Sequence, residues 1–224
     1  MSGVNKKSSI ASATRVQNPC RHRGFGATAR LARLRTVARS DSNFSYTRGF
    51  RKISEFPYNF EGKMVLDIGS STGGFTEYAL AQGAEKVIAV EKGTNQMKAP
   101  LRFDPRIELH EKTDIFEFTT EEKIDTVVAD VSFISLTKVL KYVRMRLARS
   151  NTDFLVMVKP QFEAEPRQLN KGVVKNERTR REILKRFEEW LKRNDFIVRM
   201  KKDNELRGKN GNLERFYWLK QAKK

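Results

Sequence analysis

The chain of 224 residues has the length of one ordinary domain with an appendage, and 38% hydrophobic residues suffice for a buried core. A formal net charge of +18 favours a polyanionic partner, nucleic acid before membrane. No apolar run approaches the ~18 residues needed to span a bilayer. A single cysteine, Cys20, excludes an intramolecular disulfide, and with two histidines it argues against a zinc site.

The positive charge lies at the two ends of the chain. Residues 1–40 carry a net charge of +9, residues 41–170 carry −1 and residues 171–224 carry +10. A near-neutral middle between basic ends indicates a ligand-binding core flanked by surfaces for a polyanion. A lysine-rich surface that serves solubility alone is the alternative, but it does not explain this partition.

The first forty residues are rich in Arg and Ser and contain no acidic residue. That composition is typical of an organelle transit peptide, and equally of a disordered basic arm that binds nucleic acid. We expect little stable structure before about residue 44. We therefore divide the chain into a basic arm, residues 1–43, and one domain, residues 44–224. A cytoplasmic location is expected, or an organelle if the arm is a transit peptide.

From residue 44 onward, predicted helices and strands alternate, after a short helix or turn that Pro57 ends. Short apolar runs predict strands at 63–68, 86–91, 106–111, 124–132 and 153–160. Apolar periodicity and capping residues predict helices at 73–82, 94–103 with a kink or stop at Pro100, 136–147 and 176–193. Two last strands, 195–201 and 213–220, have no helix between them, which predicts an antiparallel hairpin at the sheet edge.

This alternation predicts an α/β fold with a seven-stranded, mostly parallel sheet and helices on both faces. In such sheets the ligand lies beyond the carboxyl ends of the strands. Four charged residues end predicted strands at that edge, namely Asp67, Glu91, Asp130 and Lys159.

The stretch MVLDIGSSTGGF, residues 64–75, runs from an apolar strand into a turn of small residues. No Gly-Lys-Ser/Thr follows, so it is not a P-loop, and Ser71 stands where a dinucleotide site has its second glycine. Asp67 would repel a pyrophosphate but attract a cation, and S-adenosylmethionine carries an ammonium and a sulfonium. The alternative is that the glycines only cap a strand and begin a helix.

We therefore predict a site for S-adenosylmethionine at this turn. Glu91 is expected to accept hydrogen bonds from the ribose hydroxyls, and Asp114 to reach the adenine amino group. The predicted cofactor-binding residues are Asp67, Gly69, Ser70, Ser71, Thr72, Gly73, Gly74, Phe75, Glu91, Asp114 and Asp130.

Asp130 and Lys159 end adjacent predicted strands and should lie close together on one rim. Such a pair can be a surface salt bridge, which contributes little, or it can orient and deprotonate a hydroxyl. Burial lowers the pKa of a lysine, but a paired acid raises it. Lys159 is therefore expected to position the hydroxyl and stabilise developing charge more than to remove the proton.

Several motifs together closely resemble the TlyA-type RNA methyltransferases, which are related to FtsJ-like ribose 2′-O-methyltransferases. They are LDIGSSTGGFTEYALAQGA, VEKGTNQM, LRFDPRI, DVSFISL, VKPQFE, KGVV and GNLE, in the family's order. The resemblance covers residues 46–219 and implies a Rossmann-like methyltransferase fold that uses S-adenosylmethionine. It also implies a catalytic tetrad of Lys52, Asp130, Lys159 and Glu214, of which Lys52 and Glu214 depend on the resemblance alone.

The chain departs from the family's pattern in two places. Family members usually begin with a small RNA-binding domain, and residues 1–43 are too short for it and lack its pattern. RNA docking is then expected on the basic arm, on the basic C-terminal helix or through a partner. Residues 203–214, DNELRGKNGNLE, lack the Ser-Pro-Ile segment that the family tends to place before its last motif, so the resemblance does not define the loop near Glu214.

The expected function is S-adenosylmethionine-dependent 2′-O-methylation of RNA ribose, with ribosomal RNA or a ribosomal subunit as the partner. A non-catalytic RNA-binding or ribosome-assembly factor that keeps the cofactor fold is the alternative. Many family members are labelled haemolysins, but no membrane-spanning or strongly amphipathic apolar segment supports a pore or a membrane partner here.

Overall fold

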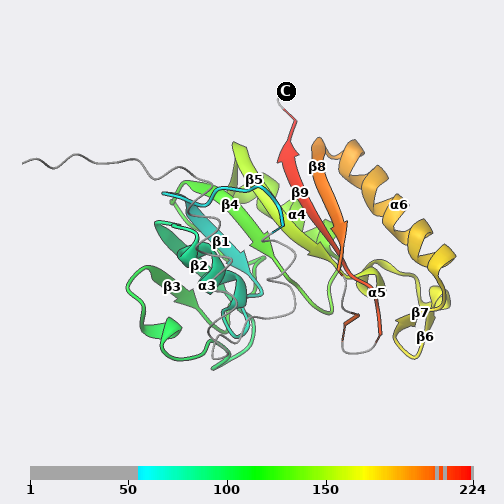
Figure 1. Cartoon of the computed structure of the whole chain (residues 1–224), viewed down its shortest axis with the longest axis horizontal. Helices are drawn as coiled ribbons and strands as arrows, with labels where there is room; N and C mark the ends of the chain where they lie inside the picture. Colours follow the sequence, from blue (N-terminus) through cyan, green and yellow to red (C-terminus); the bar gives the residue numbers. More distant parts are fainter. Residues whose placement is uncertain (1–54, 205–206, 209–210, 223–224) are drawn as a thin grey trace, which may run out of the picture. The chain divides into compact units, whose positions relative to one another are not determined.

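The computed structural model describes residues 55–204, 207–208 and 211–222 of the chain. Within these residues seven strands form one sheet, in the order β3-β2-β1-β4-β5-β9-β8 (Figure 1). The strands are β1 (Met64–Ile68), β2 (Lys86–Val90), β3 (Ile107–His110), β4 (Ile124–Ala129), β5 (Ala148–Val158), β8 (Phe196–Asp203) and β9 (Arg215–Gln221). The predicted arm, residues 1–43, and the predicted catalytic residue Lys52 lie outside the described residues.

The sheet is parallel except for one strand. β1 pairs in parallel with β2 and β4, β2 with β3, and β4 with β5. β9 is antiparallel to both of its neighbours, β5 and β8. The predicted mostly parallel sheet with an antiparallel C-terminal hairpin at its edge is therefore confirmed.

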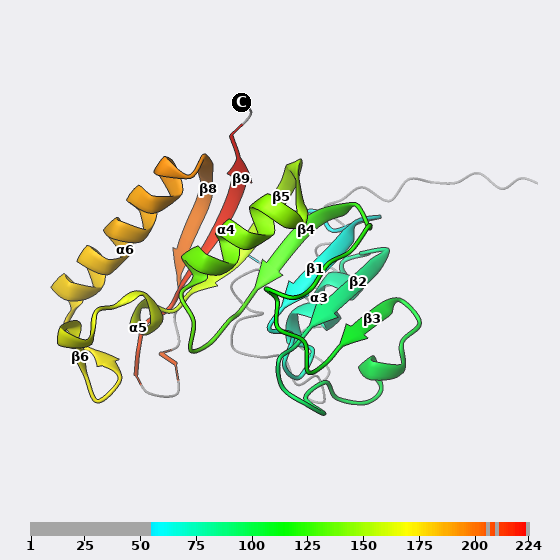
Figure 2. The ribbon, with the colours of Figure 1, turned by 180° about the vertical axis from the view of Figure 1, so that it is seen from behind.

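Helices cover both faces of the sheet, because strand side chains alternate between the faces. Leu66 and Ile68 pack in one core with α4 (Leu136–Arg146) and α6 (Glu177–Arg193). Val65 packs on the opposite face with α3 (Gly74–Ala81). Figure 2, seen from behind, shows α4 and α6 lying across the first of these faces.

The prediction of a helix at 94–103 is wrong. This segment is a loop that ends in a short 3-10 turn, η1 (Leu101–Phe103). The carboxylate of Glu111 accepts hydrogen bonds from the backbone N–H groups of residues 95–97, at 2.8 to 3.3 Å. Those donors are thus used by a side chain from after β3 instead of helix carbonyls. Pro100 supplies no N–H at all.

Several elements after β4 were not predicted from the sequence. β5 begins at Ala148, five residues before the predicted start at residue 153. The apolar pattern missed this part of the strand because residues 149–152 are polar and three of them are exposed. A short helix α5 (Pro160–Glu163), a 3-10 turn η2 (Pro166–Gln168) and a small hairpin of β6 (Leu169–Asn170) and β7 (Val173–Val174) connect β5 to α6. Among the described residues, no helix is both long and apolar enough to cross a membrane.

Candidate active site

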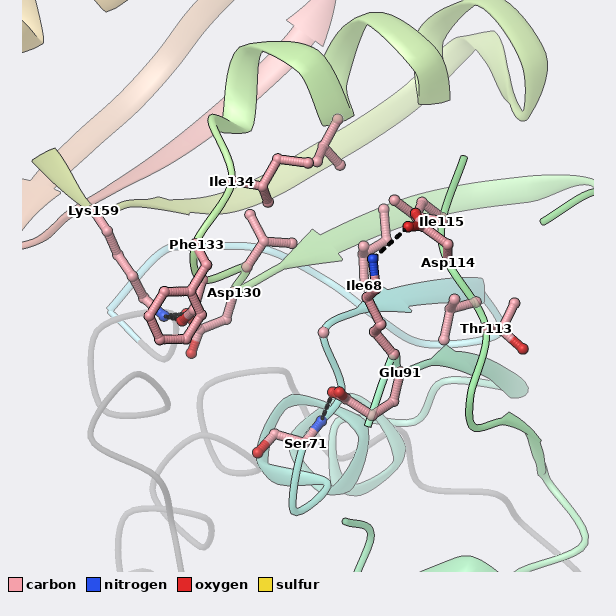
Figure 3. Close-up of a pocket in the computed structure, with 16 residues that line it drawn as sticks. Ile68, Ser71, Glu91, Thr113, Asp114, Ile115, Asp130, Phe133, Ile134 and Lys159 are labelled. Atoms are coloured by element: carbon pink, nitrogen blue, oxygen red, sulfur yellow. Dashed lines mark hydrogen bonds and ion pairs between the residues drawn. The ribbon is translucent and has the colours of Figure 1, made fainter. Parts of the chain in front are cut away.

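A pocket of about 600 Å³ opens at the carboxyl ends of β1, β2, β4 and β5. The chain proceeds from β1 through β2 to β3 on one side and continues with β4 on the other, so the pocket lies at the switch point of the sheet. The predicted site residues that line it are Gly69, Ser71, Glu91, Asp114, Asp130 and Lys159. Figure 3 shows side chains from all of these strand ends facing one space.

The glycine turn brings the end of β1 against the end of β4. Gly69 has φ +76°, and a Cβ atom on it would lie 2.9 Å from the carbonyl oxygen of Asp130. Only glycine permits both this conformation and this approach. Gly73, with φ +94°, begins α3 in the same left-handed region. Ser71 is also left-handed, at φ 47°, and its N–H donates to Glu91 Oε2 at 2.9 Å.

Asp67 lies beneath this turn and does not line the pocket. The Thr76 hydroxyl donates to its Oδ2 at 2.6 Å, whereas its Oδ1 is buried with no hydrogen-bond partner among the described residues. Burial is the main cause that raises the pKa of the Asp67 carboxyl to about 7. The Ser70 hydroxyl is likewise buried without a partner in the described chain.

These two orphaned acceptors fit a ligand that brings hydrogen-bond donors and positive charge. A buried acceptor without a partner costs about 1–3 kcal/mol, and the carboxylate charge of Asp67 beneath the turn favours a cationic group bound above it. In the rest of the predicted turn, Thr72 and Gly73 precede α3 and Gly74 and Phe75 begin it, and none of the four lines the pocket.

Two further acids line the wall by β2 and β3. Glu91 follows β2, and its carboxylate accepts hydrogen bonds from the backbone N–H groups of Ser71 and Gly93, the second at 2.7 Å. Asp114 accepts from Lys92 Nζ at 2.8 Å, and this contact is the main cause that lowers the pKa of Asp114. Both carboxylates are therefore fixed acceptors beside a space that a nucleoside could fill.

Asp130 and Lys159 meet on the wall by β4 and β5, as predicted. Lys159 Nζ lies 2.6 Å from Asp130 Oδ1 and donates to Ser132 Oγ at 2.7 Å. The Lys159 side chain is only 12% exposed. Burial raises the pKa of the Asp130 carboxyl, and the adjacent Lys159 opposes that shift. An ammonium held by two partners at a pocket wall still has one N–H with which to bind a ligand oxygen.

Glu214 lies at the same end of the sheet. The antiparallel ladder of β5 and β9 ends with Val158, which precedes Lys159, paired with Arg215, which follows Glu214. Glu214 is buried, and Asn204 Nδ2 donates to its Oε2 at 3.3 Å. The structure thus brings three predicted tetrad residues to one sheet edge, while Lys52 is outside the described residues.

Sequence reasoning assigned no role to three residues near this pair. Ser132 holds Lys159, and Phe133 lines the pocket while its side chain is 92% exposed. Glu163 binds the start of α4, with its Oε1 accepting from the Leu136 N–H at 2.6 Å. All three belong to the motifs DVSFISL and KPQFE, so the motifs located them without indicating their contacts.

A family model described as FtsJ-like methyltransferase matches residues 46–221, which include every strand and helix above. The chain belongs to the FtsJ-like methyltransferase family. The predicted Rossmann-like methyltransferase fold and the predicted family are thereby confirmed.

Two relatives of this FtsJ-like methyltransferase carry names that state an activity. The Campylobacter jejuni protein named 23S rRNA (cytidine-2′-O)-methyltransferase TlyA is 36% identical over 168 residues, 74% of this chain and 65% of that protein. The Mycobacterium tuberculosis protein named 16S/23S rRNA (cytidine-2′-O)-methyltransferase TlyA is 34% identical over 197 residues, 83% of this chain and 72% of that protein. The chain thus spans slightly less than two thirds of the Campylobacter relative.

A solved structure of a hemolysin-named protein from Streptococcus thermophilus superposes on the chain with a TM-score of 0.75 and 30% identity. The superposition covers 81% of this chain and 68% of that one.

Proposed function

We propose that this protein transfers a methyl group from S-adenosylmethionine to a ribose 2′-hydroxyl of RNA, with ribosomal RNA as the substrate. The observation that carries the proposal is the Lys159–Asp130 pair, 2.6 Å apart, on the wall of a pocket whose other wall carries Glu91 and the glycine turn. The same pocket is therefore lined by a pair that can orient a hydroxyl, Lys159 and Asp130, and by carboxylates that can accept hydrogen bonds from a nucleoside. The names of the two relatives support ribosomal RNA as the substrate.

The residues on the glycine-turn side suit the parts of the cofactor. Asp67, buried beneath the turn, would attract its ammonium end through the carboxylate charge, Glu91 would accept from its ribose hydroxyls and Asp114 from its adenine amino group. When bound, S-adenosylmethionine supplies a methyl group already activated on a sulfonium. The acidic wall disfavours ligands with a pyrophosphate at the same place, because like charges repel.

Lys159 and Asp130 would act on the RNA hydroxyl. The ammonium of Lys159, fixed by Asp130 and Ser132, would donate to the 2′-oxygen and stabilise the negative charge that grows there. As the O–CH₃ bond forms and the S–CH₃ bond breaks, the hydroxyl proton would pass to the Asp130 carboxylate, and the neutral thioether would leave. Glu214 and Lys52 would orient Lys159 and the hydroxyl. Because the methyl donor is already activated, alignment and charge stabilisation are the main contributions of the protein.

Phe133 gives the RNA side of the pocket an aromatic surface. Its ring is 92% exposed and lies 5.3 Å, centroid to centroid, from that of Phe162. Its backbone has φ 65°, which is uncommon for an aromatic residue and indicates a constrained position. A nucleobase next to the reacting ribose could stack on such a ring.

Transfer of labelled methyl groups to protein-free ribosomal RNA, mapped by mass spectrometry, tests the proposal. We expect 2′-O-methylation by the wild-type protein and its loss in Lys159→Ala, with cofactor affinity retained. Lys192→Ala, on the exposed surface near the end of α6, is the matched control and should remain active. Full activity of Lys159→Ala would contradict the mechanism. A role in RNA binding alone predicts no heat on titration with S-adenosylmethionine.

A further inference from the structure

The small hairpin β6–β7 presents a lysine at a position that normally favours glycine or asparagine. Asn170 pairs with Val173, so Lys171 and Gly172 form a two-residue loop. Both have positive φ, 47° and 78°, as in a type I′ turn. A Cβ atom on Gly172 would meet nothing within 4 Å, so the tip stands in open space. The turn geometry therefore does not account for a lysine at this position.

The hairpin is held firmly against the segment that carries Glu214. Asn212 Oδ1 accepts from the Val174 N–H at 2.9 Å, and Asn212 Nδ2 donates to the Gly172 carbonyl at 3.0 Å. Arg180, which is buried on α6, donates from Nε to the carbonyl of Leu213 at 2.9 Å. The motifs KGVV and GNLE are thus joined by direct hydrogen bonds, and the tip has a defined place relative to the active site.

Two lysines of this hairpin are available for an anionic ligand. Lys171 at the tip and Lys175 after β7 are exposed, and neither forms an ion pair within the described part of the chain. Nearby Arg167 and Arg178, by contrast, are paired with Glu165 and Glu182. Figures 1 and 2 both show β6 and β7 beside α5, at the end of the sheet where the parallel strands terminate.

We infer that Lys171 and Lys175 form a phosphate-binding clamp for the RNA strand next to the methylated ribose. This inference rests on the proposed function, which supplies the RNA. The hairpin follows Lys159 after a short helix and turn and is hydrogen-bonded to the segment before Glu214. It therefore lies on the side of the pocket that carries Lys159, where we expect a strand whose ribose enters the pocket to continue. Rigid attachment favours binding, because the lysine backbones need not be ordered when RNA arrives.

The test uses the full chain and protein-free large-subunit ribosomal RNA. Lys171→Asn suits the type I′ turn better than lysine does, and Lys175→Gln removes the second charge. The matched control is Lys192→Gln with Arg193→Gln, which removes two exposed charges at the far end of α6. The two ends of that helix are ~24 Å apart, from a rise of 1.5 Å per residue. Lys171→Arg keeps the charge at the tip.

We expect the Lys171→Asn/Lys175→Gln protein to bind RNA more weakly, with a log–log salt slope reduced by about one for each lysine. Its melting temperature should be unchanged or higher, and its affinity for S-adenosylmethionine unchanged. Lys171→Arg and the α6 control should keep the wild-type slope. An unaltered slope in the double variant, or an equal decrease in the α6 control, would overturn the clamp.

Binding is measured apart from methyl transfer, so the two proposals can fail separately. A reduced slope without methylation of any RNA would retain the clamp and refute the proposed function. Methylation of RNA together with an unaltered salt slope would support the proposed function and refute the clamp.

Discussion

Glu163 and Ser135 are 28 positions apart in the chain, and the Glu163 carboxylate accepts a hydrogen bond of 2.6 Å from the Ser135 hydroxyl. Ser135 caps α4, and the same carboxylate also accepts from the Leu136 N–H at 2.6 Å. Glu163 thus ties the segment after β5, which carries Lys159, to the loop after β4, which carries Asp130. The geometry of the proposed reacting pair depends on this link.

Replacing Glu163 tests the link. Glu163→Ala should lower methyl transfer on the order of 10²-fold, as expected when reacting groups are displaced by about 1 Å. Affinity for S-adenosylmethionine should not change, because Glu163 does not line the pocket. Glu163→Gln should retain most activity, since its amide oxygen can accept from Leu136 and its NH₂ can donate to Ser135. Equal losses in both variants would show that the charge, and not the link, is required.

Cofactor binding should depend on pH through Asp67. Its pKa is raised to about 7 by burial, and a cationic ligand requires the ionised form. Affinity for S-adenosylmethionine should therefore fall as the pH decreases, by roughly tenfold between pH 8 and pH 6. Calorimetry on Asp67→Asn is the control, because the ratio of the two affinities cancels titration of the ligand's own amino group. A ratio that stays constant over this range would exclude Asp67 as the titrating group.

The approach of β1 to β4 should make Gly69 irreplaceable. Gly62 and Gly69 both have positive φ, but a Cβ on Gly62 meets nothing within 4 Å, whereas one on Gly69 meets the Asp130 carbonyl oxygen. Gly62→Ala should cost about 1–2 kcal/mol of unfolding free energy from conformation alone. Gly69→Ala should cost at least ~1 kcal/mol more and also abolish methyl transfer by displacing Asp130. Urea unfolding measures both; equal costs would show that the contact relaxes freely.

The exposed ring of Phe133 should contribute to RNA use and not to stability. Phe133→Ala should lower kcat/KM for RNA by about 5- to 150-fold, equivalent to 1–3 kcal/mol of stacking. The melting temperature should stay within a degree or two, because the side chain is 92% exposed. Phe103→Ala is the control, since Phe103 is 77% exposed and does not line the pocket. A similar loss in both variants would contradict a specific role for Phe133.

Local patterns were enough to predict most of the fold. Short apolar runs and helical periodicity located the strands and the main helices, because both depend on neighbours close in sequence. The loop at 94–103 was mispredicted because its backbone donors bind Glu111, a residue beyond the next strand. The hairpin β6–β7 was missed because two-residue strands carry no periodic signal, and its hydrogen bonds to Asn212 are long-range.

At the site, local patterning alone predicts which residues end the parallel strands, and therefore that Asp130 and Lys159 share one rim with Glu91. The same patterning predicts that a run of small residues follows β1. The folded chain is needed to show that Asp67 is buried beneath the turn with one oxygen unpaired, and that Ser132 and Glu163 hold the segments of the reacting pair. It is also needed to show that the Lys171 hairpin lies beside the Glu214 segment. The physical reason is that strand order follows from local patterning, whereas burial and side-chain partners depend on segments that meet only when the chain folds.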